Sequence, residues 1–565
     1  MTASPRGDEL AEAFLYAQPW PQITKSSLSE LDIQNIITNI KLRHDVSFDK
    51  DLSFRPNHDG VRGKEKRKAG ELYWDALIAE MMLYEQLFKG TPSPLSSEYS
   101  DMTELVRQSQ KRIPRMFQTL QEVLKSLVPD RDHCRVDEHL DVPMLMQQIQ
   151  RNVCDLPKLA EWLAQLLTEH CAPMRDNMVE EMVGSIRLGV FKNDPHQIVR
   201  GLRKLLGILE AMKLDVANHQ IRNLKTLLVE DTINFERHYH LERLVNGRAR
   251  VNIENAQRWY AASTEKFRQS CPPKRHSHGS QLEVFARAVT TIFFSNDPRC
   301  EFPDTFYLDY ERLRQLKSEV DDLVYFEICF DTYEDLFGAL GYGRLASQAT
   351  KHLLHGALSA VLGEGAGHGT SHWMNNCENI AAELIRQAFL ATGRPPFLSA
   401  DLIQQTTRKL RNTLIPSIIQ RKAQALEFGV QSQVLSTVNR HIRSSPMELF
   451  NTLVVLPGPP PPPQAPSQPL ASFQHSPSNT FSSQNIEQYN DLSNRIAHII
   501  LIHWRTWGPI AYVQEEAPVP LGSTVPQPQQ STLTSAPVAA TLAPVGLSVE
   551  PLDPNKIPAQ QTQSP

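Results

Sequence analysis

The chain has 565 residues, of which 41% are hydrophobic and 21% charged, so it can bury at least one large core. Its formal net charge of -5 gives no field that would draw the whole molecule onto nucleic acid or an anionic membrane, and we expect no nucleic-acid partner. The seven cysteines are scattered and never form a C-x-x-C pair, which suits a reducing compartment.

The sequence also carries no targeting or membrane signal that we recognise. The first 30 residues lack a basic start followed by an apolar stretch. Apolar runs such as residues 499–502 are too short to cross a bilayer. We therefore expect no transmembrane segment and a cytoplasmic location, with the nucleus as a further possibility.

The N-terminal part begins with polar segments. Residues 1–40 have the composition of a flexible arm with one weakly helical patch. Residues 41–62 are rich in Asp, Pro, Asn and Gly, which predicts an extended or turning lead-in. Over residues 64–88, apolar side chains recur every three or four positions from Leu72 onward, with Trp74 broadening the stripe. This spacing predicts an amphipathic helix.

Helical patterns continue along the chain. Residues 102–128 and 156–167 are amphipathic, and Pro114 would kink or split the first of these segments. A clearer helix begins at Asp194, an acidic N-cap that is followed by proline at the first helical position. Its apolar stripe continues toward Arg237. We interpret it as a long bundle helix rather than a coiled-coil arm, because the strict heptad seam ends after about three repeats.

The second half of the chain is also predicted to be helical. Short β-branched runs such as residues 454–455 have no partner with period-two alternation, so strand signals are nearly absent. The predicted fold class is all-α: a large irregular bundle of antiparallel amphipathic helices, with a disordered Pro-rich insertion and C-terminal tail. Further helices are predicted over 253–266, 281–294, 304–336, 344–362, 375–392, 399–441 and 486–507.

Composition divides the chain into five segments. The insertion is rich in Pro and Ser and includes PGPPPPP, which favours polyproline II, while the tail has no aromatic residue. The segments are a flexible N-terminal arm (1–40), a helical domain (41–445), a Pro/Ser-rich linker (446–484), a final helix that packs back on the domain (485–513) and a disordered tail (514–565).

A basic cluster stands at the start of the predicted helix over 64–88. Positive charge is unfavourable at this end of a helix because of the macrodipole. A nuclear-import receptor, a phosphate-rich partner or an acidic protein groove would use it. The alternative is a solvated helix face paired with Glu65 and Glu71. The cluster consists of Arg62, Lys64, Lys66, Arg67 and Lys68.

Phe54, Arg55 and Pro56 lie in the lead-in. Proline restrains the residue before it to an extended conformation, so Phe54 is presented to a pocket. We interpret the pocket as intramolecular, so that the lead-in staples the first helices, and keep docking to another protein as the alternative.

Ser277 follows Lys274 and Arg275 in a loop, the charge pattern that a basophilic kinase reads. A phosphate there would add negative charge beside the basic pair and order the loop, so Ser277 is a candidate phosphosite.

Two other patterns argue against bound groups. The Gly-rich residues 363–369 follow a predicted helix and lack the preceding strand that a dinucleotide fingerprint needs. They also separate possible metal ligands with a segment too flexible to preset a tetrahedral site. We therefore predict no metal, cofactor or catalytic residue. The possible ligands are His352, His355, His368, His372 and Cys377.

Four segments resemble the T-complex protein eleven family, in particular its fungal branch, which includes a yeast suppressor of lost kinase activity. They are KLRHDVSFDKDLSFRPNHDG at 41–60, RGKEKRKAGELYW at 62–74, HLERLVNGRARVNIENAQRWY at 240–260 and RIAHIILIHWRTWGPIAY at 495–512. The resemblance implies an all-helical domain and a role in cyclic-AMP and protein kinase A signalling. It brings no catalytic residues to carry over.

Together these observations predict a non-enzymatic regulator or adaptor that acts in protein kinase A signal transduction by protein–protein binding. The alternative is a scaffold whose Pro-rich insertion recruits proline-binding domains. An enzyme would need convergent polar groups that the sequence does not display.

Overall fold

The structure, a computed structural model, describes residues 5–56, 60–89, 110–268, 278–297, 300–341, 348–363, 369–393, 395, 399–454 and 489–513. Every regular element in these ranges is helical and none is a strand, so the predicted all-α class is confirmed. Ser277, the PGPPPPP run and the C-terminal tail lie outside the described residues. No helix within these ranges combines the length and the apolar content that a membrane crossing needs.

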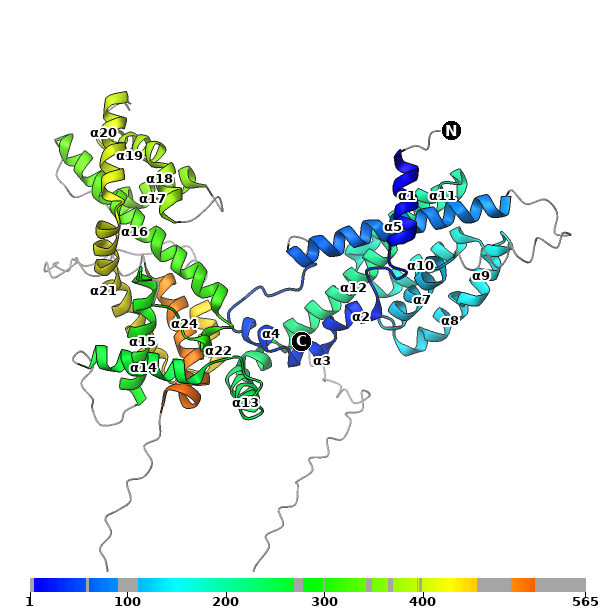
Figure 1. Cartoon of the computed structure of the whole chain (residues 1–565), viewed down its shortest axis with the longest axis horizontal. Coiled ribbons are helices and arrows are strands. Elements are labelled where there is room, and N and C mark those ends of the chain that lie inside the picture. Colours follow the sequence, from blue (N-terminus) through cyan, green and yellow to red (C-terminus); the bar gives the residue numbers. More distant parts are fainter. Residues whose placement is uncertain are drawn as a thin grey trace, which may run out of the picture. The chain divides into compact units, whose positions relative to one another are not determined.

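The helices of the first half of the chain pack around one another and around the long helix α12 (Figure 1). They are α1 (Pro5–Tyr16), α2 (Lys25–Leu28), α3 (Ile33–Thr38), α4 (Ile40–Asp45), α5 (Val61–Lys89), α7 (Arg112–Lys125), α8 (His133–His139), α9 (Val142–Gln150), α10 (Leu156–His170), α11 (Asp176–Lys192) and α12 (Pro195–Glu230).

In the second half, α21 contacts both α16 and α24, and α15 contacts all three of these helices. The helices are α13 (Thr232–Val245), α14 (Ile253–Phe267), α15 (His278–Phe294), α16 (Tyr310–Ala339), α17 (Gln348–Leu362), α18 (Thr370–Asn375), α19 (Cys377–Ala391), α20 (Ala400–Thr413), α21 (Pro416–His441), α22 (Pro446–Leu449) and α24 (Asn490–Trp507). The short turns η4 (Asp304–Phe306), η5 (Phe450–Val454) and η6 (Gly508–Tyr512) connect them.

Helix α12 begins where the sequence predicted and ends earlier. The Asp194 carboxylate accepts the backbone N–H of His196 at 2.9 Å, and Pro195 occupies the first turn. The expected continuation toward Arg237 is wrong, because the helix ends at Glu230 and α13 starts at Thr232. The break turns α13 toward α4 and α24, which both contact it.

Proline explains another difference from the predicted helices. The segment expected as one helix over 399–441 is two helices, and Pro416 starts the second. Proline has no N–H to donate and disfavours a helical conformation in the residue before it, so a helix rarely passes through it. Residues 446–454, expected to belong to the linker, are instead helical, and Leu449 and Phe450 are buried.

Buried apolar residues form two large cores and a smaller one that draws on distant parts of the sequence. One large core joins α5 with α7–α12, and the other joins α14–α21 with α24. The small core contains Ile36, Val46, Ile221 and Phe450, so it joins α3 and the residue after α4 to the end of α12 and to η5. The lead-in therefore belongs to the folded body.

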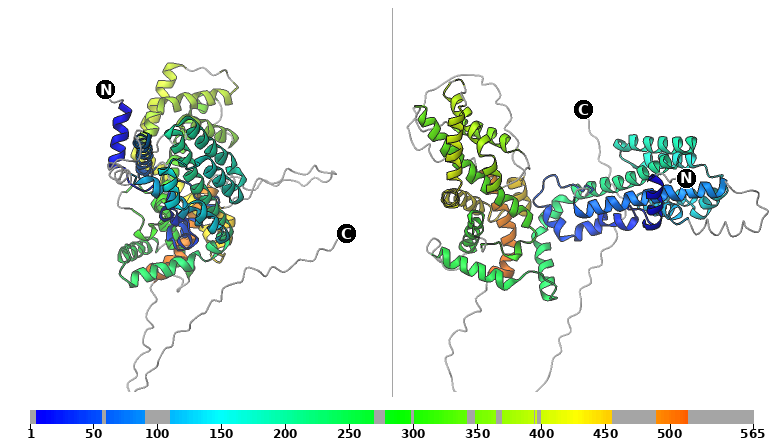
Figure 2. Two further views of the ribbon diagram at one scale, coloured as in Figure 1. Left: turned by 90° about the vertical axis from the view of Figure 1, so that its right-hand side faces the viewer. Right: turned by 45° about the horizontal axis from the view of Figure 1, so that its top comes forward.

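The N-terminal arm also packs against the body. Ala13 and Ala17 contact Ala76 of α5, and Figure 2 shows α1 lying against that helix. Arg112 of α7 also holds this segment, since its guanidinium donates to the Ala17 carbonyl oxygen at 2.7 Å. The Glu80 carboxylate accepts the backbone N–H groups of Arg112 and Ile113 at 2.8 and 3.1 Å, which caps α7 from another helix. Residues 5–38, expected to be largely a flexible arm, thus contain three packed helices.

Helix α5 buries much of the predicted stripe, including Trp74 and Ala76, but not all of it. Tyr73 is fully buried as well, whereas Leu72 is 37% exposed. Glu80 also lies on the buried face, where its carboxylate caps α7. A hydrophobicity pattern does not anticipate a carboxylate inside the core.

Candidate functional site

The lead-in carries a buried histidine that joins three parts of the chain. Helix α4 occupies residues that were expected to be extended or turning, so that expectation is wrong for residues 41–45. His44 is 3% exposed, and its Nδ1 lies 2.8 Å from Oε1 of Glu236 in α13. Its Nε2 lies 2.9 Å from Oδ1 of Asp309, just before α16. We call His44, Glu236 and Asp309 the His44 network.

The two carboxylates keep His44 protonated. Burial alone would lower the pKa of His44, but the charges of Asp309 and Glu236 outweigh burial and raise that pKa to about 10. Only the imidazolium can donate a hydrogen bond from both ring nitrogens, as this geometry requires. Burial also opposes ionisation of Asp309, yet His44 and Arg312 hold the pKa of its carboxyl below the usual value.

Further contacts surround the His44 network and close it off. Arg312 pairs with Asp309 at 2.9 Å and with Asp45, and its guanidinium lies 4.3 Å from the centre of the Phe48 ring. On the other side, Arg43 pairs with Asp231 at 2.7 Å. Since both nitrogens of His44 are occupied and the ring is buried, the network holds the fold together.

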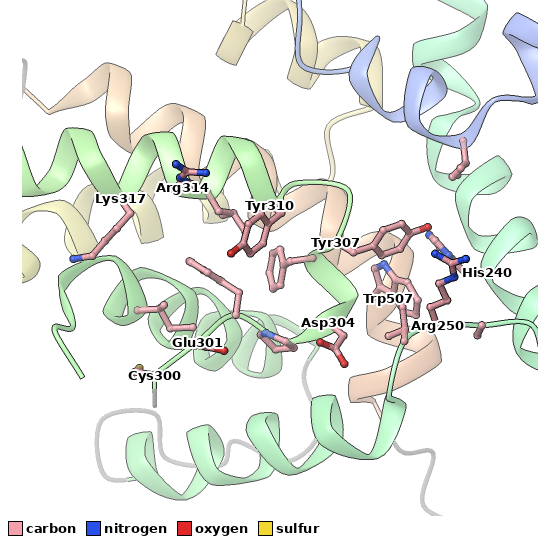
Figure 3. A pocket seen from close by; sticks show the side chains of 18 of the residues that line it. His240, Arg250, Cys300, Glu301, Asp304, Tyr307, Tyr310, Arg314, Lys317 and Trp507 are labelled. Atoms are coloured by element: carbon pink, nitrogen blue, oxygen red, sulfur yellow. The ribbon is translucent and has the colours of Figure 1, made fainter. Parts of the chain in front are cut away.

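A pocket of about 750 Å³ lies next to this network. It is lined by side chains from α13, from the segment before α14, from residues 300–307 and from α16, with Trp507 of α24 (Figure 3). The volume falls in the range that holds a drug-sized molecule or a few residues of peptide. We call it the His240 pocket, after the histidine in its lining.

His240 is 4% exposed, and its Nε2 has no hydrogen-bond partner in the described part of the chain. Burial, with a smaller effect of His44, lowers the pKa of His240 to about 4, so the ring is neutral. Its ring centre lies 4.3 Å from that of Trp507 and 5.9 Å from that of Tyr307. The inner wall of the pocket is therefore aromatic, with one unsatisfied polar atom.

The mouth of the pocket exposes aromatic and basic side chains. Tyr307 is 43% and Tyr310 66% exposed. Arg250 and Arg314 are exposed too, and neither side chain pairs with another described residue. Figure 3 shows Arg314 toward one side of the pocket and Arg250 toward the other.

The lining combines potential nucleophiles with exposed aromatic and basic side chains. Two nucleophile types line the pocket, Ser295 and Cys300, but no hydrogen bond joins either of them to a base among the described residues. In those same residues no three His, Cys, Asp or Glu side chains gather in a way that would hold a metal. Exposed tyrosines and arginines beside a preformed cavity are typical of a recognition surface.

The basic cluster predicted at the start of α5 lies on the surface. All five of its side chains, Arg62, Lys64, Lys66, Arg67 and Lys68, are exposed. Glu71, which we expected to neutralise them, pairs instead with Arg203 of α12, at 2.8 Å for one oxygen. The role of the cluster in import or partner binding stays a prediction.

Phe54 packs inside the molecule. Its ring contacts the small core, its backbone N–H donates to Asn218 Oδ1 at 2.6 Å, and its carbonyl accepts from Asn218 Nδ2 at 3.1 Å. Arg55 and Pro56 are exposed. These contacts hold the lead-in against α12, and the staple of the first helices stays a prediction.

The residues weighed as metal ligands are engaged separately or not described. His355 contacts the Phe326 ring, His372 lies 3.2 Å from the Leu362 carbonyl oxygen, and the Cys377 thiol donates to the Trp373 carbonyl. His368 lies outside the described residues, as do residues 364–367 and the side chain of His352.

The sequence analysis missed the residues that line the His240 pocket. They come from helices and turns that are far apart in the chain, and His240 itself has the pattern of an ordinary helical residue. The sequence does carry one indication of the pocket in residues 248–250. Two arginines lie there in the turn after α13, and not on a helix where neighbouring acidic side chains pair with them.

Comparisons with known proteins cover the same region. A family model described as T-complex protein 11 matches residues 42–517, which contain both the His44 network and nearly all of the pocket. Protein SOK1 of Saccharomyces cerevisiae is 28% identical over 65% of this chain and 40% of its own length. T-complex protein 11-like X-linked protein 1 of Homo sapiens is 21% identical over 52% of this chain and 57% of its own.

The T-complex protein 11 homolog of Rattus norvegicus is 26% identical over 50% of this chain and 47% of its own length. The chain thus spans between 40% and 57% of the length of these three relatives. No solved structure matches it.

Proposed function

Because the chain belongs to the T-complex protein 11 family, we propose that it is a non-enzymatic regulator or adaptor that acts by binding a protein partner. We further propose that the partner belongs to cyclic-AMP and protein kinase A signalling, the pathway that the resemblance to the fungal branch implies. The partner binds at the mouth of the His240 pocket.

One observation carries this proposal: large aromatic and basic side chains are exposed together around a preformed cavity. Tyr307 and Tyr310 contribute aromatic surface, and Arg250 and Arg314 contribute charge that no described residue neutralises. Tyrosine, tryptophan and arginine provide most hot spots of protein–protein interfaces, because they bury much surface and keep a polar group.

The protonation state of His240 favours binding over catalysis in this pocket. A general acid or base works best with a pKa near the working pH, whereas burial lowers the pKa of His240 to about 4. The neutral ring therefore cannot supply a proton at pH 7. It can form one hydrogen bond with a bound group.

The test uses cells that have lost protein kinase A activity. Raised expression of the full chain should restore their growth, and the double variant Tyr307→Ala/Tyr310→Ala should not. Truncating two hot-spot side chains is expected to weaken capture of the partner by about tenfold or more. Capture is measured by quantitative co-purification of the tagged chain.

Phe428→Ala is the matched control, since Phe428 is an 81% exposed aromatic residue of α21 that does not line the pocket. It should restore growth like the unchanged chain. Full activity of the tyrosine variant would contradict the proposed surface. A further variant that lacks residues 455–484 tests the scaffold alternative, in which the Pro-rich segment does the recruiting.

A further inference from the structure

We infer that the His240 pocket receives an acidic peptide segment of the partner, anchored by an aromatic side chain that carries a polar tip, as tyrosine does. This inference rests on the proposed function and adds the chemistry of the bound segment. Three features of the pocket support it: its inner wall, its charge and its apolar margin.

The inner wall of the pocket determines which side chain of the peptide fits as its anchor. Trp507 is 3% exposed and lies against His240, so a flat aromatic ring finds aromatic surface to stack on. The His240 Nε2 is buried without a partner among the described residues, and His240 is one of the residues that line the cavity. A buried nitrogen of this kind gains a hydrogen bond only from the occupant. A tyrosine hydroxyl both stacks and satisfies it, whereas a phenylalanine ring only stacks.

The charge of the lining selects acidic residues around the anchor. Four basic side chains, Arg243, Arg250, Arg314 and Lys317, outnumber the two acidic ones in the lining, Glu301 and Asp304, neither of which forms an ion pair with a described residue. Lys317 is already engaged, since its Nζ donates to the Phe293 carbonyl and to Asp321, each at 2.8 Å.

Arg243 is engaged as well. It lies over the Tyr239 ring at 5.3 Å and donates to the Arg248 carbonyl at 3.3 Å. This leaves Arg250 and Arg314 without a partner in the described residues, on different segments of the lining. Two separate guanidinium groups fit carboxylates that precede and follow the anchor, because each can bind a carboxylate with two parallel hydrogen bonds.

The apolar margin favours an extended segment over a small anionic molecule. Tyr307 is 43% and Tyr310 66% exposed, and both also line a smaller adjoining hollow together with Leu308. Their rings continue the apolar surface beyond the cavity. A peptide covers such a margin, whereas a ligand enclosed by the pocket leaves it exposed to water.

The experiment measures binding of labelled peptides to the full chain by fluorescence anisotropy. The probe is a seven-residue peptide with tyrosine at its centre and glutamate on both sides. Replacing the tyrosine by phenylalanine should weaken binding roughly threefold to tenfold, the effect of one hydrogen bond. Replacing the glutamates by lysine should abolish binding. Adenosine monophosphate serves as the small-molecule competitor.

Variants of the chain assign these effects to residues. Arg250→Ala and Arg314→Ala should each weaken binding of the acidic peptide roughly fivefold or more and make it less dependent on salt. Both side chains are exposed, so folding is preserved, which thermal melting checks. Arg421→Ala, an exposed arginine on α21, should change neither. In His240→Phe the preference for tyrosine over phenylalanine should disappear.

Equal binding of the acidic and the lysine peptide, or unchanged affinity in the Arg250→Ala/Arg314→Ala double variant, would overturn the inference. So would tight binding of adenosine monophosphate without binding of the peptide. These failures are separable from failure of the proposed function. If Tyr307→Ala/Tyr310→Ala still loses the partner while no acidic peptide binds, the surface stands and only its ligand chemistry is wrong.

Discussion

The His44 network and the His240 pocket are both built around a buried histidine, and their histidines are in opposite states. Glu236 of the network and His240 of the pocket lie one turn apart on α13. His44 has a carboxylate at each ring nitrogen, and its pKa rises to about 10. His240 lacks such partners, and burial lowers its pKa to about 4.

This difference shows that burial by itself does not tell a structural histidine from a binding one. The number of satisfied ring nitrogens and the presence of a cavity do so together, since the buried Nε2 of His498 also lacks a described partner but His498 does not line the pocket. A histidine with both nitrogens occupied is committed to the fold, whereas one with an unsatisfied nitrogen beside a cavity has a hydrogen bond to offer. Four experiments can test this contrast between His44 and His240, in order of decreasing expected effect.

The largest effect should be loss of stability in acid. Burial lowers the pKa of His240 to about 4 and of His498 and His503 to about 3, so all three are neutral in the folded chain at pH 5 and protonated in the unfolded one. The unfolded state then binds up to three more protons. The free energy of unfolding should fall by up to about 4 kcal/mol per pH unit below pH 6.

The measurement is urea unfolding between pH 7 and pH 4, with proton uptake followed at pH 5. The sign follows from the lowered pKa values: their stabilising contribution is present above the unfolded value of about 6.5 and is lost as the pH falls. A free energy of unfolding that stays constant down to pH 4.5 would show that these histidines are already charged or solvated.

Removing the charged histidine should cost nearly as much. His44→Ala leaves Glu236 and Asp309 buried with part of their compensation gone, and the free energy of unfolding at pH 7 should fall by about 3 to 5 kcal/mol. His238→Ala is the control, because His238 is exposed on the same helix α13. That change should stay within about 0.5 kcal/mol. Similar losses in both variants would refute the difference in role.

The raised pKa of His44 should also make the free energy of unfolding depend on pH in alkali, with a smaller slope than in acid. The folded chain holds one more proton than the unfolded chain between pH 6.5 and about pH 10, so this contribution to stability is full below that window and is lost as the pH rises through it. The slope is about 1.4 kcal/mol per pH unit. Comparing the chain with His44→Ala isolates it, since the variant should lack this part of the slope.

The smallest effect is expected for His240→Phe. The change removes a buried nitrogen that has no described partner and keeps an aromatic ring against Trp507. The free energy of unfolding should change by less than about 1 kcal/mol, in either direction. A loss above about 2 kcal/mol in thermal or urea unfolding would mean that the nitrogen is satisfied in the folded chain, and the contrast with His44 would vanish.

Local signals predicted much of the fold. The Asp194-Pro195 start of α12, the amphipathic segments and the apolar final helix α24 all appear where their residues predict them, because caps, proline and spacing act over one or two turns. The positions at which helices end were harder to predict. The helix end at Glu230 depends on contacts of α13 with α4 and α24, which lie far away in the chain.

Short-range patterns were enough to predict an all-helical chain, the positions of most helices and the resemblance to its family. Which histidines are charged depends instead on contacts that form only in the folded chain. His44 lies 192 residues before Glu236 and 265 before Asp309, so nothing near it in the sequence shows the two carboxylates that bind it. The pocket has the same origin, because its charge and its unsatisfied nitrogen exist only where α13, α16 and α24 meet.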